Sequence, residues 1–273
     1  MTHPLTWTTL PAQGDFSAAQ TLDCGQCFRW TLEPDGSWIG LTEHTPARVR
    51  DRDGMLEIQT LPGTEPLWRS YFDCALDYPS IRAAFSVDAF TKAAADYGCG
   101  IRILRQDPWE ALCAFLISQC NNIPRIRAIL TRLCESLGEP IVFDGQVLYT
   151  FPSPETLAPL ERADLEFLRA GYRAPYLIHA ARAVCDGSLD FTALAAMDTD
   201  SARHHIMQLR GVGRKVADCF LLFGLHKLDA FPVDTWMKKA AVYYDGDFSA
   251  FQNSPYAGVY QQYIFYYIRS VLQ

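Results

Sequence analysis

The sequence predicts an α+β fold, in which an N-terminal antiparallel β-sheet domain precedes two mostly α-helical domains. Two observations carry this prediction. Apolar residues alternate with period two in several segments up to about residue 61, and from residue 67 onward they recur with the 3.6-residue period of a helix. We therefore expect the sheet and its covering helices over residues 1–105 and an all-helical region over residues 106–273.

The predicted strands are marked by alternation and by the turns between them. Apolar side chains alternate at residues 28–32, 37–41 and 55–58. Pro34-Asp35-Gly36 and Asp51-Arg52-Asp53-Gly54 are typical turn sequences. A sheet of four or five strands follows. Residues 67–97 have the pattern of two or three helices, which we expect to cover the sheet.

Helix starts are marked by capping residues in the second half of the chain, which we expect to stay helical to its end. Asp107-Pro108-Trp109-Glu110 places Asp at the N-cap, Pro at the first helical position and Glu where it completes a capping box. The helix over 109–118 is apolar nearly all round, so we expect it to be buried. Further helices are expected at about 124–138, from 153, and at 174–185, 202–209, 214–225, 235–244 and 259–272.

The composition is that of a globular protein, because 49% of the 273 residues are hydrophobic and 20% are charged. No stretch approaches the roughly 18 consecutive apolar residues that a membrane span needs. Met1-Thr2-His3-Pro4 does not begin a secretory signal. We expect an intracellular protein of a prokaryotic cytoplasm or nucleoid rather than of a nucleus, with no membrane partner.

The nine cysteines are an odd number and are scattered through predicted helices, so we expect most to be reduced core residues. Cys24 and Cys27 form the one Cys-x-x-Cys, and no second pair at zinc spacing accompanies it. A tight four-cysteine cluster is also missing from the sequence. The sequence therefore predicts no structural metal cluster and no cofactor.

The net charge of −7 is unevenly distributed. Residues 203–240 hold seven Lys/Arg against three Asp, a local charge of +4, which leaves −11 on the rest of the chain. A basic face on an acidic body suits contact with a polyanion at one surface only.

Two glycines, Gly211 and Gly213, separate an amphipathic run from an apolar helix. Glycine lets the backbone approach a partner closely, and the free N–H groups at the start of the next helix favour an anion. The segment is typical of a helix-hairpin-helix element, at about residues 202–225, that binds a phosphate. Lys215, in the first turn of that helix, has two interpretations. It adds a phosphate contact, or it is a nucleophile, because the helix start, Arg214 and the apolar run favour its neutral amine.

Asp234 follows Lys215 by nineteen residues, in Phe231-Pro232-Val233-Asp234-Thr235. The simplest interpretation is that Asp234 caps the helix that begins after it. A capping carboxylate is also held in one position, so the same residue can serve a site.

These motifs resemble those of the helix-hairpin-helix DNA glycosylases that carry a Gly/Pro-rich loop and an aspartate, and more narrowly those of the 8-oxoguanine DNA glycosylases. The core of the resemblance is Leu-x-Gly-Val-Gly-x-Lys-Val-Ala-Asp at 209–218, followed by Pro-Val-Asp at 232–234. Five further segments match in order between about residues 20 and 270: 24–30 (Cys-Gly-Gln-Cys-Phe-Arg-Trp), 105–108 (Arg-Gln-Asp-Pro), 121–126 (Asn-Asn-Ile-x-Arg-Ile), 171–174 (Gly-Tyr-Arg-Ala) and 255–258 (Pro-Tyr-Ala-Gly).

The resemblance implies a monomeric bifunctional enzyme that acts on double-stranded DNA containing 8-oxoguanine. The damaged base would be extruded from the duplex into a pocket. Lys215 would attack C1′, expel the base and form a Schiff base, after which β-elimination of the 3′ phosphate can follow. Asp234 would stabilise the positive charge that develops on the sugar.

The family's recognition residues map onto this sequence. The carbonyl of Gly25 would accept the N7 hydrogen that distinguishes 8-oxoguanine from guanine. Cys219 and Phe265 would sandwich the base, and Gln261 would read its Watson–Crick edge. Without the resemblance, Cys219 and Phe265 would be assigned to the core.

A second set of residues would hold the DNA around the lesion. The resemblance assigns the opposite cytosine to Arg125 and Arg173, which lie at predicted exposed helix starts, and the wedge in the base stack to Tyr172. The alternative is a solvated arginine pair beside a packed tyrosine. Further DNA contacts would come from Asn121, Gly211 and Gly213, and the carbonyls of Met207, Leu209 and Val212 could hold a cation that bridges to phosphate.

Two positions depart from the family pattern. Cys120 stands where the family commonly has the first of three asparagines, and cysteine is a poor hydrogen-bond donor. Trp236 stands where the family often has a histidine; its indole N–H can donate to a phosphate but carries no charge. We therefore expect relaxed discrimination for cytosine opposite the lesion.

Two other functions remain open at this point. One is a glycosylase for a different lesion, which an iron–sulfur cysteine set or a wide aromatic-lined pocket would favour. The other is a catalytically silent helix-hairpin-helix module that binds DNA structurally. The presence of both Lys215 and Asp234 argues against the silent module.

Overall fold

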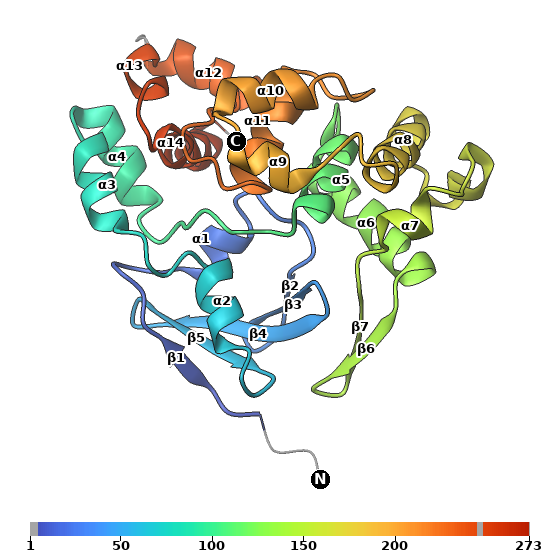
Figure 1. Cartoon of the computed structure of the whole chain (residues 1–273). Coiled ribbons are helices and arrows are strands. Elements are labelled where there is room, and N and C mark those ends of the chain that lie inside the picture. Colours follow the sequence, from blue (N-terminus) through green and yellow to red (C-terminus); the bar gives the residue numbers. More distant parts are fainter. Residues whose placement is uncertain (1–4, 245–247, 273) are drawn as a thin grey trace.

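A five-stranded antiparallel sheet forms the base of the molecule, with helices above it (Figure 1). The computed structural model describes residues 5–244 and 248–272, so Met1 to Pro4, on which the absence of a secretory signal was predicted, lie outside the described residues. The strand order is β1 (Thr8–Leu10), β5 (Met55–Thr60), β4 (Thr45–Arg52), β3 (Trp38–Thr42) and β2 (Thr31–Leu32). The predicted number of strands is confirmed.

The register of the sheet gathers its large apolar side chains on one face. Val49 of β4 lies opposite Ile58 of β5 and Trp38 of β3, and all three are buried. Helices α1 (Ala18–Leu22) and α2 (Glu65–Tyr71) contribute Leu22 and Trp68 to the same apolar cluster. The sheet therefore has its own core.

The prediction that the helices over residues 67–97 cover the sheet is wrong for α3 (Tyr78–Phe85) and α4 (Ala89–Tyr97). Only α2 does so; α3 and α4 pack against the C-terminal helix α14 (Ala257–Val271) (Figure 1). Phe85 stacks on Tyr260 with the ring centroids 4.7 Å apart. The reason is that Trp68, Tyr71 and Phe72 already fill the apolar face of the sheet.

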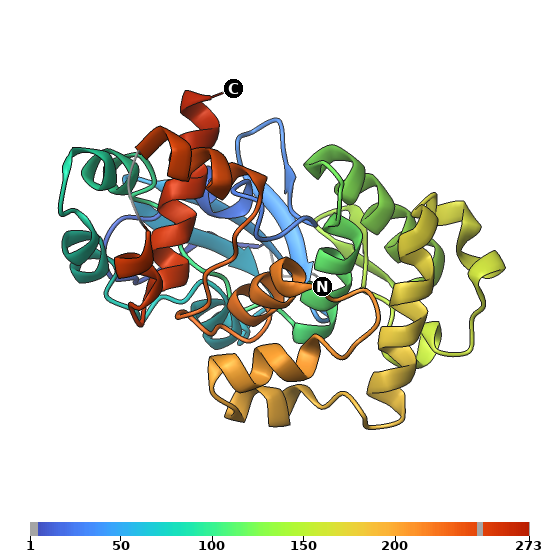
Figure 2. The same ribbon diagram turned by 90° about the horizontal axis from the view of Figure 1, so that it is seen from above.

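Helix α5 (Pro108–Ser118) lies at the centre of the helical region. Its residues from Ala111 to Ile117 are all buried, as predicted, and it packs against α6 (Ile123–Leu137), α8 (Ala174–Cys185) and α11 (Arg214–Phe223). Seen from above, α5, α6 and α8 occupy one side of the molecule and α3, α4 and α14 the other (Figure 2). The remaining helices are α7 (Pro154–Leu157), two 3₁₀ helices (Arg162–Leu168 and Gly171–Arg173), α9 (Phe191–Ala196), α10 (Thr199–Ile206), α12 (Thr235–Tyr244) and α13 (Ser249–Gln252).

Two local expectations are wrong. A hairpin of β6 (Pro140–Phe143) and β7 (Gln146–Tyr149) interrupts the region expected to be all-helical, because Asp144 and Gly145 adopt positive φ and form a tight turn. Asp107 does cap α5, but Glu110 does not complete a capping box. The Glu110 carboxylate instead pairs with Arg29 at 2.5 Å across the domain boundary.

None of the helices within residues 5–244 and 248–272 is long and apolar enough to cross a membrane.

Candidate active site

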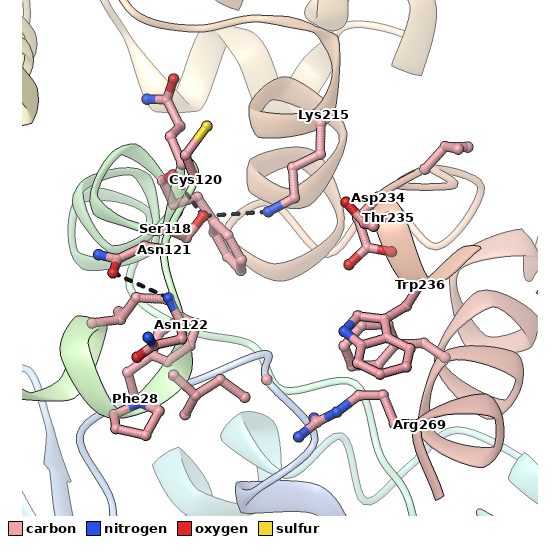
Figure 3. A pocket seen from close by; sticks show the side chains of 18 of the residues that line it. Phe28, Ser118, Cys120, Asn121, Asn122, Lys215, Asp234, Thr235, Trp236 and Arg269 are labelled. Atoms are coloured by element: carbon pink, nitrogen blue, oxygen red, sulfur yellow. Dashed lines mark hydrogen bonds between the residues drawn. The ribbon is translucent and has the colours of Figure 1, made fainter. Parts of the chain in front are cut away.

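A cavity of about 630 Å³ opens between the α5–α6 turn, the start of α11, the start of α12 and α14 (Figure 3). Seven of the residues predicted to form the site line it: Gly25, Cys120, Asn121, Lys215, Asp234, Trp236 and Phe265. A narrow pocket of about 40 Å³ shares part of this lining and adds Cys219 and Gln261. The fold thus brings together segments that lie up to 240 positions apart in the sequence.

Lys215 reaches the cavity from the first turn of α11. Gly213 is the N-cap of this helix and supplies no capping side chain, so the helix start offers backbone N–H groups to a partner. The Nζ of Lys215 donates a hydrogen bond to Ser118 Oγ at 3.3 Å and lies 5.5 Å from the centroid of the Phe115 ring. Figure 3 shows the hydrogen bond between the Lys215 amine and the Ser118 hydroxyl.

Asp234 serves as a helix cap and also faces the cavity. Its Oδ1 accepts the backbone N–H of Met237 at 2.9 Å, which fixes the carboxylate at the start of α12. Figure 3 shows Lys215 and Asp234 directed into the same cavity from different elements. The two interpretations of Asp234, as a cap and as a site residue, are therefore compatible.

The hairpin between α10 and α11 depends on its first glycine. Gly211 has φ +92°, and a Cβ there would lie 2.5 Å from the ring of Tyr176. Gly213 has an ordinary φ and open space around it, which leaves the backbone accessible. The ion pair between Arg203 and Asp218, at 2.5 Å, joins the two helices. Burial raises the pKa of the Asp218 carboxyl, and the Arg203 guanidinium opposes that shift.

The narrow pocket is lined by the residues assigned to the flipped base. Gly25 has φ +85°, a conformation that favours glycine, and a Cβ there would make only ordinary contact with the Phe265 ring, at 3.6 Å. Cys219 is buried, and this burial raises the pKa of its thiol to about 11, although Lys215 opposes the shift. Cys219 is therefore a neutral thiol at physiological pH. Gln261 is also buried, with 3% of its surface exposed.

The residues assigned to the opposite base divide into two groups. Tyr172 and Arg125 are exposed, as predicted. Arg173 is not: it is 4% exposed, and its guanidinium donates to the carbonyls of Gln119 and Cys120 and to that of Ala170. The prediction of an exposed Arg173 is wrong because the carbonyls of Gln119 and Cys120, just after the end of α5, accept hydrogen bonds from its guanidinium.

Cys120 lies exposed at the rim with φ +46°, a conformation in which asparagine is better tolerated than cysteine. Trp236 lines the cavity, and the Lys239 amine lies 4.3 Å from the centroid of a Trp236 ring. The carbonyl of Leu209 accepts the N–H of Val212 at 3.0 Å. A cation at Met207, Leu209 and Val212 stays a prediction.

Three of the cavity residues that the sequence analysis missed make contacts with the predicted site residues or lie beside them. Ser118 contacts Lys215, Arg269 lies 5.3 Å over the Phe265 ring, and Gln262 lines the narrow pocket beside Gln261. Each owes its position to tertiary packing. The one local signal was a serine at the end of an otherwise apolar helix.

Two family models match adjoining parts of the chain. Residues 9–112 match the N-terminal domain of 8-oxoguanine DNA glycosylase, and residues 113–246 match the HhH-GPD superfamily of base excision DNA repair proteins. The class that the fold and the site define is therefore that of the helix-hairpin-helix base excision repair proteins.

Individual relatives narrow this assignment. A solved structure of MBOgg1 in complex with a low-affinity DNA ligand is 35% identical, with a TM-score of 0.93 and coverage of 100% of this chain and 98% of that one. The 8-oxoguanine glycosylase/lyase of Clostridium acetobutylicum, solved with DNA containing cytosine opposite 8-oxoguanine, is 32% identical, with a TM-score of 0.88 and coverage of 97% and 98%.

The Saccharomyces cerevisiae N-glycosylase/DNA lyase is 40% identical over 154 residues, which are 52% of this chain but only 41% of the yeast protein. The chain belongs to the 8-oxoguanine DNA glycosylase family.

Proposed function

We propose that the protein is a base excision repair enzyme that extrudes 8-oxoguanine from double-stranded DNA and removes it, preferentially when it lies opposite cytosine, with an associated lyase activity at the resulting abasic site. The observation that carries the proposal is the convergence of Lys215 and Asp234 on one cavity that continues into a buried pocket. The names of the family relatives support the same activity. The protein is proposed to act as a monomer and without a cofactor.

The chemistry follows from the groups at the cavity. The lone pair of the Lys215 amine forms a bond to C1′ while the C1′–N9 bond breaks. The electron pair of the broken bond leaves with the base, which takes up a proton. Ring opening gives a Schiff base, loss of a C2′ proton then expels the 3′ phosphate, and water releases the enzyme. Asp234 stabilises the positive charge on the sugar as the glycosidic bond breaks. Ser118, at the end of α5, accepts a hydrogen bond from the amine at the cavity (Figure 3).

Recognition of the lesion rests on one hydrogen. 8-Oxoguanine carries a hydrogen on N7, where guanine has a lone pair, and a backbone carbonyl accepts but never donates. We assign this reading to the Gly25 carbonyl, with the base held between Cys219 and Phe265. All three residues line the narrow pocket, which supports the assignment.

The preference for cytosine is assigned to Arg125 and Arg173, with Tyr172 as the wedge. The Arg173 guanidinium already donates to backbone carbonyls in the free protein. To bind the edge of cytosine, it would have to release at least one of these carbonyls. Asparagine in place of Cys120 would supply an extra donor. We therefore infer a preference for cytosine weaker than three asparagines would give.

Borohydride trapping tests the proposal. The duplex carries one 8-oxoguanine opposite each of the four bases in turn, and the enzymes are the wild type and Lys215→Gln. We expect a covalent adduct that requires Lys215 and forms fastest opposite cytosine, while Lys215→Gln still binds the duplex. Adducts that form equally fast opposite all four bases would support the enzymatic activity but would contradict the assignment of the arginine pair as a cytosine reader. Tight binding without any adduct would favour the silent DNA-binding module.

A further inference from the structure

Gln262 lies beside the proposed base-reading residue Gln261 on α14, and both side chains line the narrow pocket. We propose that Gln262 is a second specificity-determining residue, which accepts a hydrogen bond from the 2-amino group of the extruded purine and fixes the amide of Gln261. The proposal rests on the proposed function, because it concerns the same base pocket.

The hydrogen bonding of the two amides carries the argument. Gln262 Nε2 donates to Gln261 Oε1 at 3.0 Å, and each residue is 3% exposed. Gln262 Oε1 is buried and has no hydrogen-bond partner within the part of the chain that the structure describes. A buried unpaired carbonyl is unfavourable, so its presence in the lining of a ligand pocket indicates that a ligand donates to it.

The resulting pattern matches one kind of purine edge. Because Gln261 Oε1 accepts from Gln262, the Gln261 Nε2 group is left to donate, and the O6 of a guanine-type base accepts. The second lone pair of Gln261 Oε1 is available to N1–H, and Gln262 Oε1 to the 2-amino group. On an adenine-type edge the 6-amino group would face the Gln261 Nε2 group, and two donors form no hydrogen bond with each other. The two amides therefore select a 2-amino-6-oxopurine.

The pocket dimensions agree with this role. At about 40 Å³ the narrow pocket accommodates the edge of a base rather than a whole purine. It shares Gly25, Lys215, Asp234 and Phe265 with the larger cavity, which would hold the sugar and the rest of the base. The Watson–Crick edge would thus enter the end lined by the two glutamines.

The test compares 8-oxoguanine with 8-oxohypoxanthine, which lacks the 2-amino group, each opposite cytosine in the same duplex. Single-turnover excision is measured for the wild type, Gln262→Leu and Tyr263→Phe. Tyr263 is the matched control: its hydroxyl is also buried on α14 without a hydrogen-bond partner among the described residues, but it does not line the pocket. We compare the ratio of the two excision rates between variants. The two substrates differ in base-pair strength, but this difference contributes the same factor to the ratio in every variant.

We expect the ratio of rates, 8-oxoguanine over 8-oxohypoxanthine, to fall by about tenfold in Gln262→Leu and to stay at the wild-type value in Tyr263→Phe. Thermal unfolding confirms that each variant is folded. An equal loss on both substrates would assign Gln262 a structural role, and an unchanged ratio in Gln262→Leu would remove it from base recognition. A folded wild type that excises neither base would contradict the proposed function itself.

Discussion

Ser118 Oγ accepts a hydrogen bond from Lys215 Nζ across 97 positions of sequence, at 3.3 Å. The serine ends α5, and its hydroxyl hydrogen is already donated to the Phe115 carbonyl at 2.8 Å. The hydroxyl oxygen is therefore oriented before the lysine reaches it. This contact fixes the amine relative to the central helix of the fold.

Ser118→Ala is expected to slow base excision about tenfold while leaving affinity for lesion DNA unchanged, because one hydrogen bond that positions the amine is lost. Single-turnover excision and equilibrium binding measure the two effects. Ser86→Ala is the matched control, since that hydroxyl also donates to a carbonyl in the last turn of a helix, outside the cavity. An unaltered excision rate in Ser118→Ala would show that the amine is positioned without the serine.

Cys120→Asn is expected to stabilise the protein by about 0.5 kcal/mol, because asparagine tolerates the left-handed conformation that Cys120 adopts. The same change is expected to increase the preference for cytosine opposite the lesion, since it adds a donor at the cavity rim. Chemical denaturation and the trapping ratios opposite the four bases measure these effects. Cys185→Asn, at an exposed cysteine outside the cavity, controls for general effects. A gain in stability without a change in base preference would show that Cys120 does not take part in recognising the base opposite the lesion.

Gly211→Ala is expected to destabilise the protein by about 2 kcal/mol, because φ is +92° and the new methyl group would lie 2.5 Å from the Tyr176 ring. Gly213→Ala should cost less, about 0.5 kcal/mol for an N-cap alanine, because φ is ordinary and no atom beyond the neighbouring residues lies within 4 Å of the added Cβ. DNA affinity should fall in both variants. Urea unfolding and binding titrations separate the two glycines; equal stability losses would argue against the steric account.

The two residues proposed as the catalytic pair could be singled out in the sequence because each is marked locally. Lys215 follows a glycine turn, and Asp234 stands at a helix start. Ser118 is marked only by its place at the end of an apolar helix, and Gln262 carries no local mark. The roles proposed for them depend on where α5 meets α11 and where α14 faces the pocket. The burial of Arg173 likewise depends on carbonyls from a different helix end.

The fold shows the same division between local and tertiary signals. Alternation marked three of the five strands and predicted a sheet of four or five. Helical periodicity did not predict the packing of α3 and α4 on α14, because it does not identify the partner of a helix. The β6–β7 hairpin had a local signal, Asp144-Gly145 between two short apolar runs. This signal was overlooked because the segments before and after it have the periodicity of helices.

The last prediction concerns Asp73, a buried carboxylate between the two apolar clusters. It accepts hydrogen bonds from Arg105 Nε at 3.1 Å and from the Tyr78 hydroxyl at 3.1 Å, and His226 Nε2 lies 3.2 Å away. Burial by itself raises the pKa of the Asp73 carboxyl, but His226 and Arg105 outweigh it, so that the pKa is lower than the ordinary value of 3.8.

The sign of the pH dependence follows from this lowered pKa. A carboxyl that ionises more readily in the folded state stabilises it above the unfolded pKa, and this stabilisation is lost as pH falls through the folded pKa. Asp73→Asn keeps the side-chain shape and tolerates the positive φ of 46° at this position. We expect it to lower the free energy of unfolding by about 1 to 2 kcal/mol at neutral pH, because the buried carboxylate loses its charge while its partner Arg105 is 47% exposed.

Below about pH 4 the difference between wild type and Asp73→Asn should shrink, because the Asp73 carboxyl binds a proton in the unfolded wild-type chain before it does so in the folded protein. Urea unfolding of both proteins at about pH 7, 5 and 3 measures this. Asp77→Asn is the matched control, because Asp77 is an exposed N-cap whose only effect should be a small loss of helix capping. If the Asp73→Asn difference stayed constant down to about pH 3, hydrogen bonding that the amide cannot reproduce, rather than charge, would account for the contribution of Asp73.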